Sequence, residues 1–243
     1  MRRLLLLLLL LLMAVTFDAN ATADSTANGV TSINHANLTI GSGSNRALVA
    51  QICWSGTVTS PVLKWDNGGT PQTMTAITNA SAFNSTVAGA QLFGLVAPTS
   101  GNKTLNAAWS TARDVCLNGV SWTGVDQTGG NTTFPNGTGA TGTGTTSSVT
   151  VTSATNNAVM AAHSVNATLN AVNNTQTFRD NVPANISAGG NRAAGAASVS
   201  MTGTLVSGTW ASAGTDILAS GAVAFLAREP FIVGQAINRA GTY

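Results

Sequence analysis

Charged residues are scarce in this chain of 243 residues, because they make up 7% of it, against roughly 25% in ordinary globular proteins. Glu229 is the sole glutamate. Apart from Arg2 and Arg3, the lysines and arginines stand singly along the sequence. Binding to a phosphate backbone needs several cations on one face. We therefore expect no nucleic-acid partner.

Long stretches of the residues that favour helices are also missing after the first twelve positions. Threonine, serine, asparagine, glycine and alanine take their place. Threonine favours strands, whereas glycine and asparagine favour turns. The composition therefore predicts an almost helix-free chain with a neutral surface rich in hydroxyls and amides. All-β sandwiches of this length commonly form a single domain, and we expect one over residues 22–227.

The N-terminus carries the pattern of a secretory signal peptide over residues 1–21. Two arginines precede nine leucines, and a small-x-small cleavage site follows at residues 19–21. Nine leucines are too few to span a bilayer, so the signal peptide is the only expected membrane contact. The alternative is an over-extended gene start, with translation from Met13. We accordingly expect a secreted or cell-surface protein, with a phage virion as the alternative location.

The strongest strand signal lies at residues 45–54. Alternate residues from Leu48 to Trp54 are apolar, and after Arg46 the opposite face is interrupted only by Gln51. A short run that is apolar on both faces predicts a central strand of a packed sheet. Further strands are expected at residues 30–40, 61–66, 72–77, 90–96, 103–109, 115–122, 148–152, 158–165, 175–178, 192–201, 208–211 and 217–227.

Turn-rich stretches separate the expected strands. Residues 129–146 are a low-complexity run of glycine, threonine and asparagine, which predicts a long exposed loop. Loops are also expected at residues 79–85, 166–174 and 180–191. About a dozen short strands without helical spacers predict an antiparallel two-sheet β-sandwich, jelly-roll-like in topology. Residues 228–243 are expected to form a C-terminal tail that docks on a neighbour or frays.

Four segments carry a resemblance to a known group of proteins. They are residues 15–19, 45–49 (Asn-Arg-Ala-Leu-Val), 92–98 and 119–127, the last of which contains Ser-Trp-Thr-Gly-Val-Asp-Gln. Together they resemble a widespread group of uncharacterised modules in secreted bacterial proteins and bacteriophage virion proteins, over most of residues 15–227. The resemblance implies a lectin-like or jelly-roll sandwich used for surface display, adhesion or virion decoration. It supplies no catalytic residues.

Cys53 and Cys116 are the only cysteines, an even count in a chain with an export signal. Trp65 follows Cys53 by twelve residues, which is similar to the immunoglobulin spacing. The tyrosine expected before the second cysteine is replaced by Asp114. We predict a disulfide between Cys53 and Cys116, with two buried thiols as the alternative. Two cysteines alone do not predict a metal site.

The remaining chemically active residues give no catalytic pattern. His35 and His163 have no metal ligands or orienting acid near them in the sequence, so we expect structural imidazoles. Glycoside hydrolysis needs two facing carboxylates, whereas the best-placed aspartates stand at turns or strand ends, where aspartate caps backbone amides: Asp66, Asp126, Asp180 and Asp216. No calcium-binding loop of clustered carboxylates is present.

The candidate ligand-binding residues are Trp122, Asp126 and Gln127, from the most specific of the four segments. An exposed tryptophan could stack on a sugar ring, although most of the five tryptophans are expected in the core. We therefore expect a non-enzymatic structural or binding protein without cofactors, displayed outside the cell or on a virion. Its expected partners are neighbouring subunits, as in a homo-oligomer, or a surface glycan or protein. A lectin-like carbohydrate-binding module and a glycan-active hydrolase are the alternatives.

Overall fold

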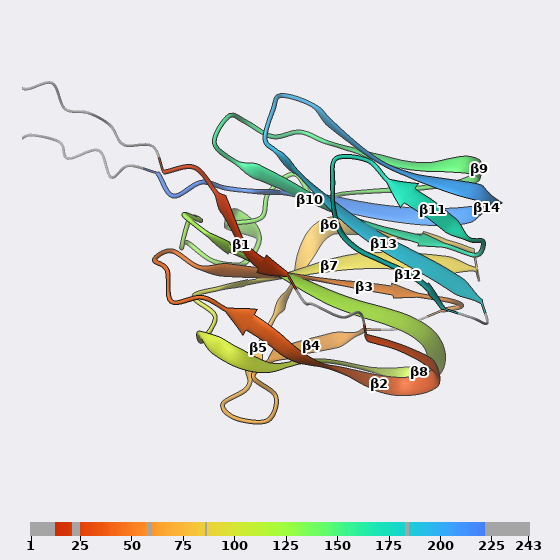
Figure 1. The fold of residues 1–243 in the computed structure, drawn as a ribbon, viewed down its shortest axis with the longest axis horizontal. Coiled ribbons are helices and arrows are strands. Elements are labelled where there is room, and N and C mark those ends of the chain that lie inside the picture. Colours follow the sequence, from red (N-terminus) through yellow and green to blue (C-terminus); the bar gives the residue numbers. More distant parts are fainter. Residues whose placement is uncertain (1–12, 21–24, 58–59, 86, 183–184, 222–243) are drawn as a thin grey trace, which may run out of the picture.

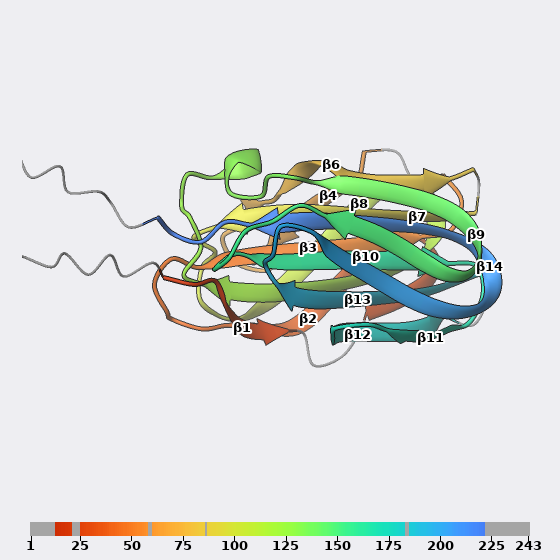
Figure 2. The same ribbon diagram turned by 90° about the horizontal axis from the view of Figure 1, so that it is seen from above.

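The structure is a computed structural model that describes residues 13–20, 25–57, 60–85, 87–182 and 185–221. Within these residues the chain forms 14 strands and one 3-10 turn. The strands make two antiparallel sheets packed face to face, with the second sheet in green to blue above the first in red to yellow-green in Figure 1. Figure 2 shows the same strands from above. The predicted all-β sandwich is confirmed.

The first sheet contains the first eight strands, in the spatial order β5-β4-β8-β3-β7-β6, with β1 and β2 also paired to β8. Their bounds are β1 (Thr16–Asn20), β2 (Ser25–Ile40), β3 (Ala47–Trp54), β4 (Val62–Trp65), β5 (Gln72–Thr73), β6 (Thr75–Asn84), β7 (Ala88–Val96) and β8 (Gly101–Thr123).

The second sheet contains the remaining strands, in the order β11-β14-β10-β13-β12, with β9 paired to β14. The chain completes one sheet before it begins the other. This order differs from the expected jelly-roll-like topology, because strands of a jelly roll alternate between the two sheets. The bounds are η1 (Gly130–Thr132), β9 (Thr138–Val151), β10 (Ala158–Val165), β11 (Leu169–Val172), β12 (Thr175–Val182), β13 (Ile186–Ala194) and β14 (Val199–Ile217).

Strand β3 lies in the interior of the first sheet, as its sequence predicts, and every one of its residues is buried. It pairs with β7 on one side and β8 on the other. Val49 and its same-face neighbours pack in the core between the two sheets. Leu48 and Ile52, on the opposite face, pack with Leu105 and Trp65 from β8 and β4. Strands of the first sheet therefore fold back over the outer face of β3. This covering explains why β3 has no polar face.

The second sheet is built in the same way around β10. Met160 contributes to the core between the sheets. Val159 packs on the opposite face with Val151 from β9 and Met201 from β14. Alternate residues of a strand point to opposite faces, so both faces of β10 are covered by protein. All of its residues are buried.

The structure corrects several expected loop assignments. Residues 129–146 were expected to be a loop, but β9 begins at Thr138 and pairs along β14. Its glycines permit close packing against β6 and β14. A Cβ on Gly139 would lie 2.0 Å from the Ser81 carbonyl oxygen, and one on Gly142 would lie 2.5 Å from the Trp210 ring. Here the glycines mark tight contact between strands.

Other strands are longer than the sequence pattern indicates. The expected strands at residues 103–109 and 115–122 join into the single 23-residue strand β8. Parts of the expected loops at residues 79–85, 166–174 and 180–191 belong to β6, β11, β12 and β13. Of the expected signal peptide at residues 1–21, residues 16–20 form β1, and residues 1–12 lie outside the described residues. The expected tail at residues 228–243 also lies outside them.

Candidate functional site

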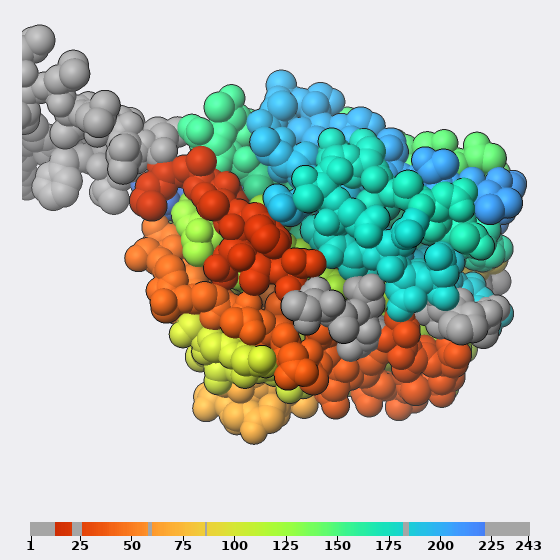
Figure 3. Space-filling view, in the orientation of Figure 1, coloured from red at the N-terminus to blue at the C-terminus, as the bar shows by residue number. Residues whose placement is uncertain are grey.

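A pocket of about 410 Å³ lies where β1 meets the second sheet. Its walls come from residues 14–17 beside β1, the turn at residues 155–158, and the ends of β12 and β13. Small-molecule sites in proteins span roughly 300–1,000 Å³, so the pocket is large enough for a small ligand. The space-filling view shows β1 in red, between the orange atoms of the first sheet and the teal and blue atoms of the second (Figure 3).

Strand β1 connects the two sheets at this site. It pairs with the last residues of β8 in the first sheet. The Val15 amide donates to the Asn156 carbonyl at 2.8 Å, and the Asn20 side-chain amide donates to the Thr177 carbonyl at 2.8 Å. Both carbonyls belong to the part of the chain that forms the second sheet. The wall made by β1 is therefore held on both sides.

Two aromatic rings and one arginine form the interior of the pocket. The rings of Phe17 and Trp122 meet edge to face, with centroids 6.2 Å apart and an interplanar angle of 88°. The Cζ of Arg192, from β13, lies 4.0 Å above the centre of the Phe17 ring, a cation–π contact. Trp122 is only 2% exposed, so its ring supports Phe17 from within the protein and offers little surface of its own to the pocket.

Arg192 is partly withdrawn from water, and this burial lowers the pKa of its guanidinium. Arginine nevertheless stays charged at neutral pH. Among the described residues, the one ion pair joins Lys103 to Asp66, and no carboxylate lines the pocket. The Asp216 carboxylate accepts from the Asn157 amide at 2.9 Å, and Asn157 separates it from the pocket.

The turn before β10 supplies the polar wall. Asn156 adopts a left-handed backbone, with φ of 74°, a conformation that asparagine tolerates better than most residues. The turn is closed by the Asn157 amide, which donates to Ala154 at 3.1 Å, and by the Gly195 amide, which donates to Asn157 at 2.9 Å. These bonds fix the backbone and leave the Asn156 side chain at the pocket surface.

The structure separates the three residues that the sequence placed in one candidate site. Trp122 lines the pocket, but Asp126 and Gln127 do not. Asp126 accepts from the backbone amide of Thr128 at 3.4 Å and from its hydroxyl. The Gln127 amide donates to the carbonyls of Arg46 and Val125, at 3.1 and 2.9 Å. Both side chains therefore stabilise the turn after β8.

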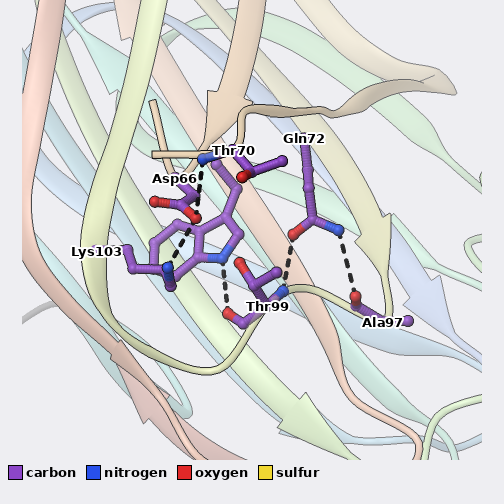
Figure 4. Close-up of polar contacts among 7 residues, drawn as sticks. Asp66, Thr70, Gln72, Ala97, Thr99 and Lys103 are labelled. Carbon is purple, nitrogen blue, oxygen red and sulfur yellow. Dashed lines mark hydrogen bonds and ion pairs between the residues drawn. The ribbon is translucent and has the colours of Figure 1, made fainter. Parts of the chain in front are cut away.

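Asp66 also has a structural role, which Figure 4 shows. Its carboxylate accepts from Lys103 Nζ at 2.7 Å, and this contact is the main reason that its pKa is lowered. Beside it, the Trp65 indole donates to the Thr99 carbonyl at 2.9 Å, and the Thr99 amide donates to Gln72 Oε1 at 2.7 Å. These bonds fix the β4–β5 turn against the β7–β8 turn.

His163 lies in a fully buried polar cluster on β10. Its Nδ1 is 3.0 Å from Ser147 Oγ and 2.9 Å from Ser212 Oγ, and its Nε2 is 3.3 Å from Asn191 Oδ1. Burial lowers the pKa of His163 to about 4. Serine, histidine and asparagine also occur in hydrolase sites, but all four side chains are shielded from solvent here. The cluster holds strands together.

Cys53 and Cys116 are direct register partners on β3 and β8, and both are buried. No disulfide joins them in the structure, which thus has the two buried thiols of the alternative. Burial raises the pKa of the Cys53 thiol. Opposed residues of an antiparallel pair have Cα atoms about 4.5–5.5 Å apart, within the range that a disulfide spans. The bridge stays a prediction for the oxidised protein.

Comparison of the chain with known protein families, curated proteins and solved structures finds no match. In the described ranges, no three histidine, cysteine or acidic side chains gather as a metal site would require. No helix in these ranges is both long and apolar enough to cross a membrane.

Sequence reasoning identified Trp122 but missed Phe17, Asn156 and Arg192 as members of one site. These residues come together only through pairing between distant strands. One signal was present in the sequence: Arg192 is a lone charge within a run of alanine and glycine. Arg192 is also the single charged residue of β13, whose other members are mostly small.

Proposed function

We propose that this chain is a non-enzymatic β-sandwich binding module that holds a small ligand in the pocket between β1 and β13. The observation that carries the proposal is the partly buried guanidinium of Arg192, stacked on Phe17 inside a pocket of about 410 Å³. A few polar groups placed on an apolar floor are typical of small-molecule sites.

The rigidity of the walls supports a binding role. Strand β1 is bonded to both sheets, and the turn at residues 154–157 is closed by backbone hydrogen bonds. A ligand would therefore enter a site that is already formed, at little cost in conformational entropy. Loops and strand ends carried by a rigid sandwich commonly serve recognition in this way.

The use of the aspartates supports a non-enzymatic function over a hydrolase. Asp66 pairs with Lys103, and Asp216 accepts from Ser153 Oγ at 2.6 Å as well as from Asn157. Asp126 caps its own turn. Each of these carboxylates is committed to a structural contact, whereas glycoside hydrolysis needs a pair facing a substrate. With the resemblance of the chain to display modules, we place the protein on an extracellular or virion surface.

The test is an array of saccharides and other small molecules probed with the full chain. The Ala194→Trp variant places a large side chain at the exposed pocket rim, and Ala171→Trp places the same side chain at an exposed position on β11. We expect at least one ligand class to bind the native chain and the A171W control but not A194W. Equal binding by all three, or no binding by any, would contradict the proposal.

A further inference from the structure

We infer that the ligand of this pocket is a sugar that carries a carboxylate, and that the carboxylate binds Arg192. The inference rests on the proposed function and names the class of ligand. It begins from charge: among the residues that the structure describes, Arg192 is the one ionisable side chain that lines the pocket. No described carboxylate pairs with it.

An incompletely paired charge is costly to withdraw from water. The Phe17 ring offsets part of this cost through the cation–π contact. A ring face accepts the charge electrostatically but leaves the guanidinium donors unused, and these donors lie in the plane of the group. Arg192 therefore retains hydrogen-bonding capacity toward the pocket, which an anionic ligand would use.

A phosphate monoester carries nearly two negative charges, whereas a carboxylate carries one, which balances the single charge of the guanidinium. Its planar fork matches the two oxygens of a carboxylate in a bidentate contact, whereas a lysine would provide only a point charge. The described residues of the pocket walls include no acidic side chain that would repel such a ligand. Asp216 is engaged by Ser153 and Asn157 and is not among the residues that line the pocket.

The other walls favour a sugar over a simple organic acid. Thr155, Asn156 and Thr175 line the pocket with hydroxyl and amide groups, which can donate to and accept from sugar hydroxyls. The alanines and Val15 provide an apolar surface for the C–H groups of a pyranose ring. The pocket volume of about 410 Å³ accommodates one such ring with its substituents.

The experiment is calorimetric titration of the full chain with glucuronate, glucose and acetate, at low ionic strength. Acetate tests the carboxylate alone, and glucose tests the ring alone. We expect glucuronate to bind at least tenfold more tightly than either. Charge-assisted hydrogen bonds of this kind contribute enough that Arg192→Gln should weaken glucuronate binding by about 10- to 100-fold. Arg192→Lys should give an intermediate affinity, because it keeps the charge and loses the fork.

Arg179→Gln is the matched control, because it removes the same charge from an exposed position on β12, outside the pocket. It should leave glucuronate binding unchanged, and thermal unfolding will establish that each variant is folded. Equal affinities for glucose and glucuronate, equal affinities for acetate and glucuronate, or equal losses in R192Q and R179Q would each overturn the inference. If glucuronate fails these tests but A194W blocks the binding of another ligand class, the inference about the ligand is wrong and the proposed binding function stands. If no ligand binds the native chain, the inference and the proposed function are both wrong.

Discussion

Acidification should destabilise the fold through His163, and the structure sets the size of the effect. The imidazole is neutral in the folded chain because burial lowers its pKa from 6.5 to about 4. In the unfolded chain it regains an ordinary pKa and binds a proton more readily. Stability is therefore complete above pH 6.5 and declines as the pH falls toward 4, where the loss levels off.

The magnitude follows from the difference between the two pKa values. A tenfold difference in proton affinity is worth about 1.4 kcal/mol. The free energy of unfolding should thus fall by about 2 kcal/mol at pH 5 and about 3 kcal/mol at pH 4, relative to pH 7. That is a large fraction of the 5–15 kcal/mol typical of a folded domain.

The assay is urea unfolding followed by tryptophan fluorescence between pH 7 and 4, on the native chain and on His163→Gln. The variant cannot titrate at this position, although it will lose stability at every pH because its contacts with Ser147, Ser212 and Asn191 change. We expect the stability difference between the two chains to shrink as the pH falls. Parallel pH profiles would refute the reasoning, because they would mean that His163 does not titrate between the two states.

Three further outcomes are expected. A variant that lacks residues 13–20 should have an unfolding free energy lower by several kcal/mol, measured by thermal melting. The remaining fold would lose the aromatic contact between Phe17 and Trp122 and the hydrogen bonds of β1 to both sheets. Gly139→Ala should cost about 1–3 kcal/mol through overpacking against a backbone carbonyl, whereas Gly68→Ala, with open space around it, should cost little; equal losses would contradict the packing argument. Intact mass of the natively produced protein should rise by about two daltons on reduction if Cys53 and Cys116 are oxidised in their cross-strand register, since each reduced thiol gains one hydrogen.

The strand architecture was predictable because hydrophobic alternation is a local signal. Residues 45–54 lack a polar face, and this alone placed β3 between two covering layers. The signal failed in β9, where glycine and threonine offer little hydrophobic contrast and the strand is held by its pairing to β14. Low-complexity sequence is typical of loops, and the packing requirement is visible only in the structure, where Gly139 contacts Ser81 and Gly142 contacts Trp210.

The candidate site was less predictable than the fold because its members are remote in sequence. Trp122 was selected through a resemblance, and Asp126 and Gln127 were selected with it because they are its neighbours along the chain. Strand β8 ends one residue after Trp122, so the following residues leave the sheet and turn away from the pocket. The partner of Trp122 is instead Phe17, its opposite neighbour in the β1–β8 register. The residues of the site are therefore neighbours across paired strands, and the sequence alone does not show which strands pair.

The position of β1 links the processing of the N-terminus to the existence of the pocket. Cleavage at residues 19–21 would remove Val15 and Phe17, and with them both the wall that closes on Asn156 and the ring under Arg192. Trp122 would then lose its edge-to-face partner, and the Arg192 charge would lose its aromatic support. A mature chain that begins at or before Met13 retains the whole site. The intact mass of the natural protein, which identifies its first residue, therefore tests the binding function. A chain that begins at residue 22 would lack the pocket on which that function depends.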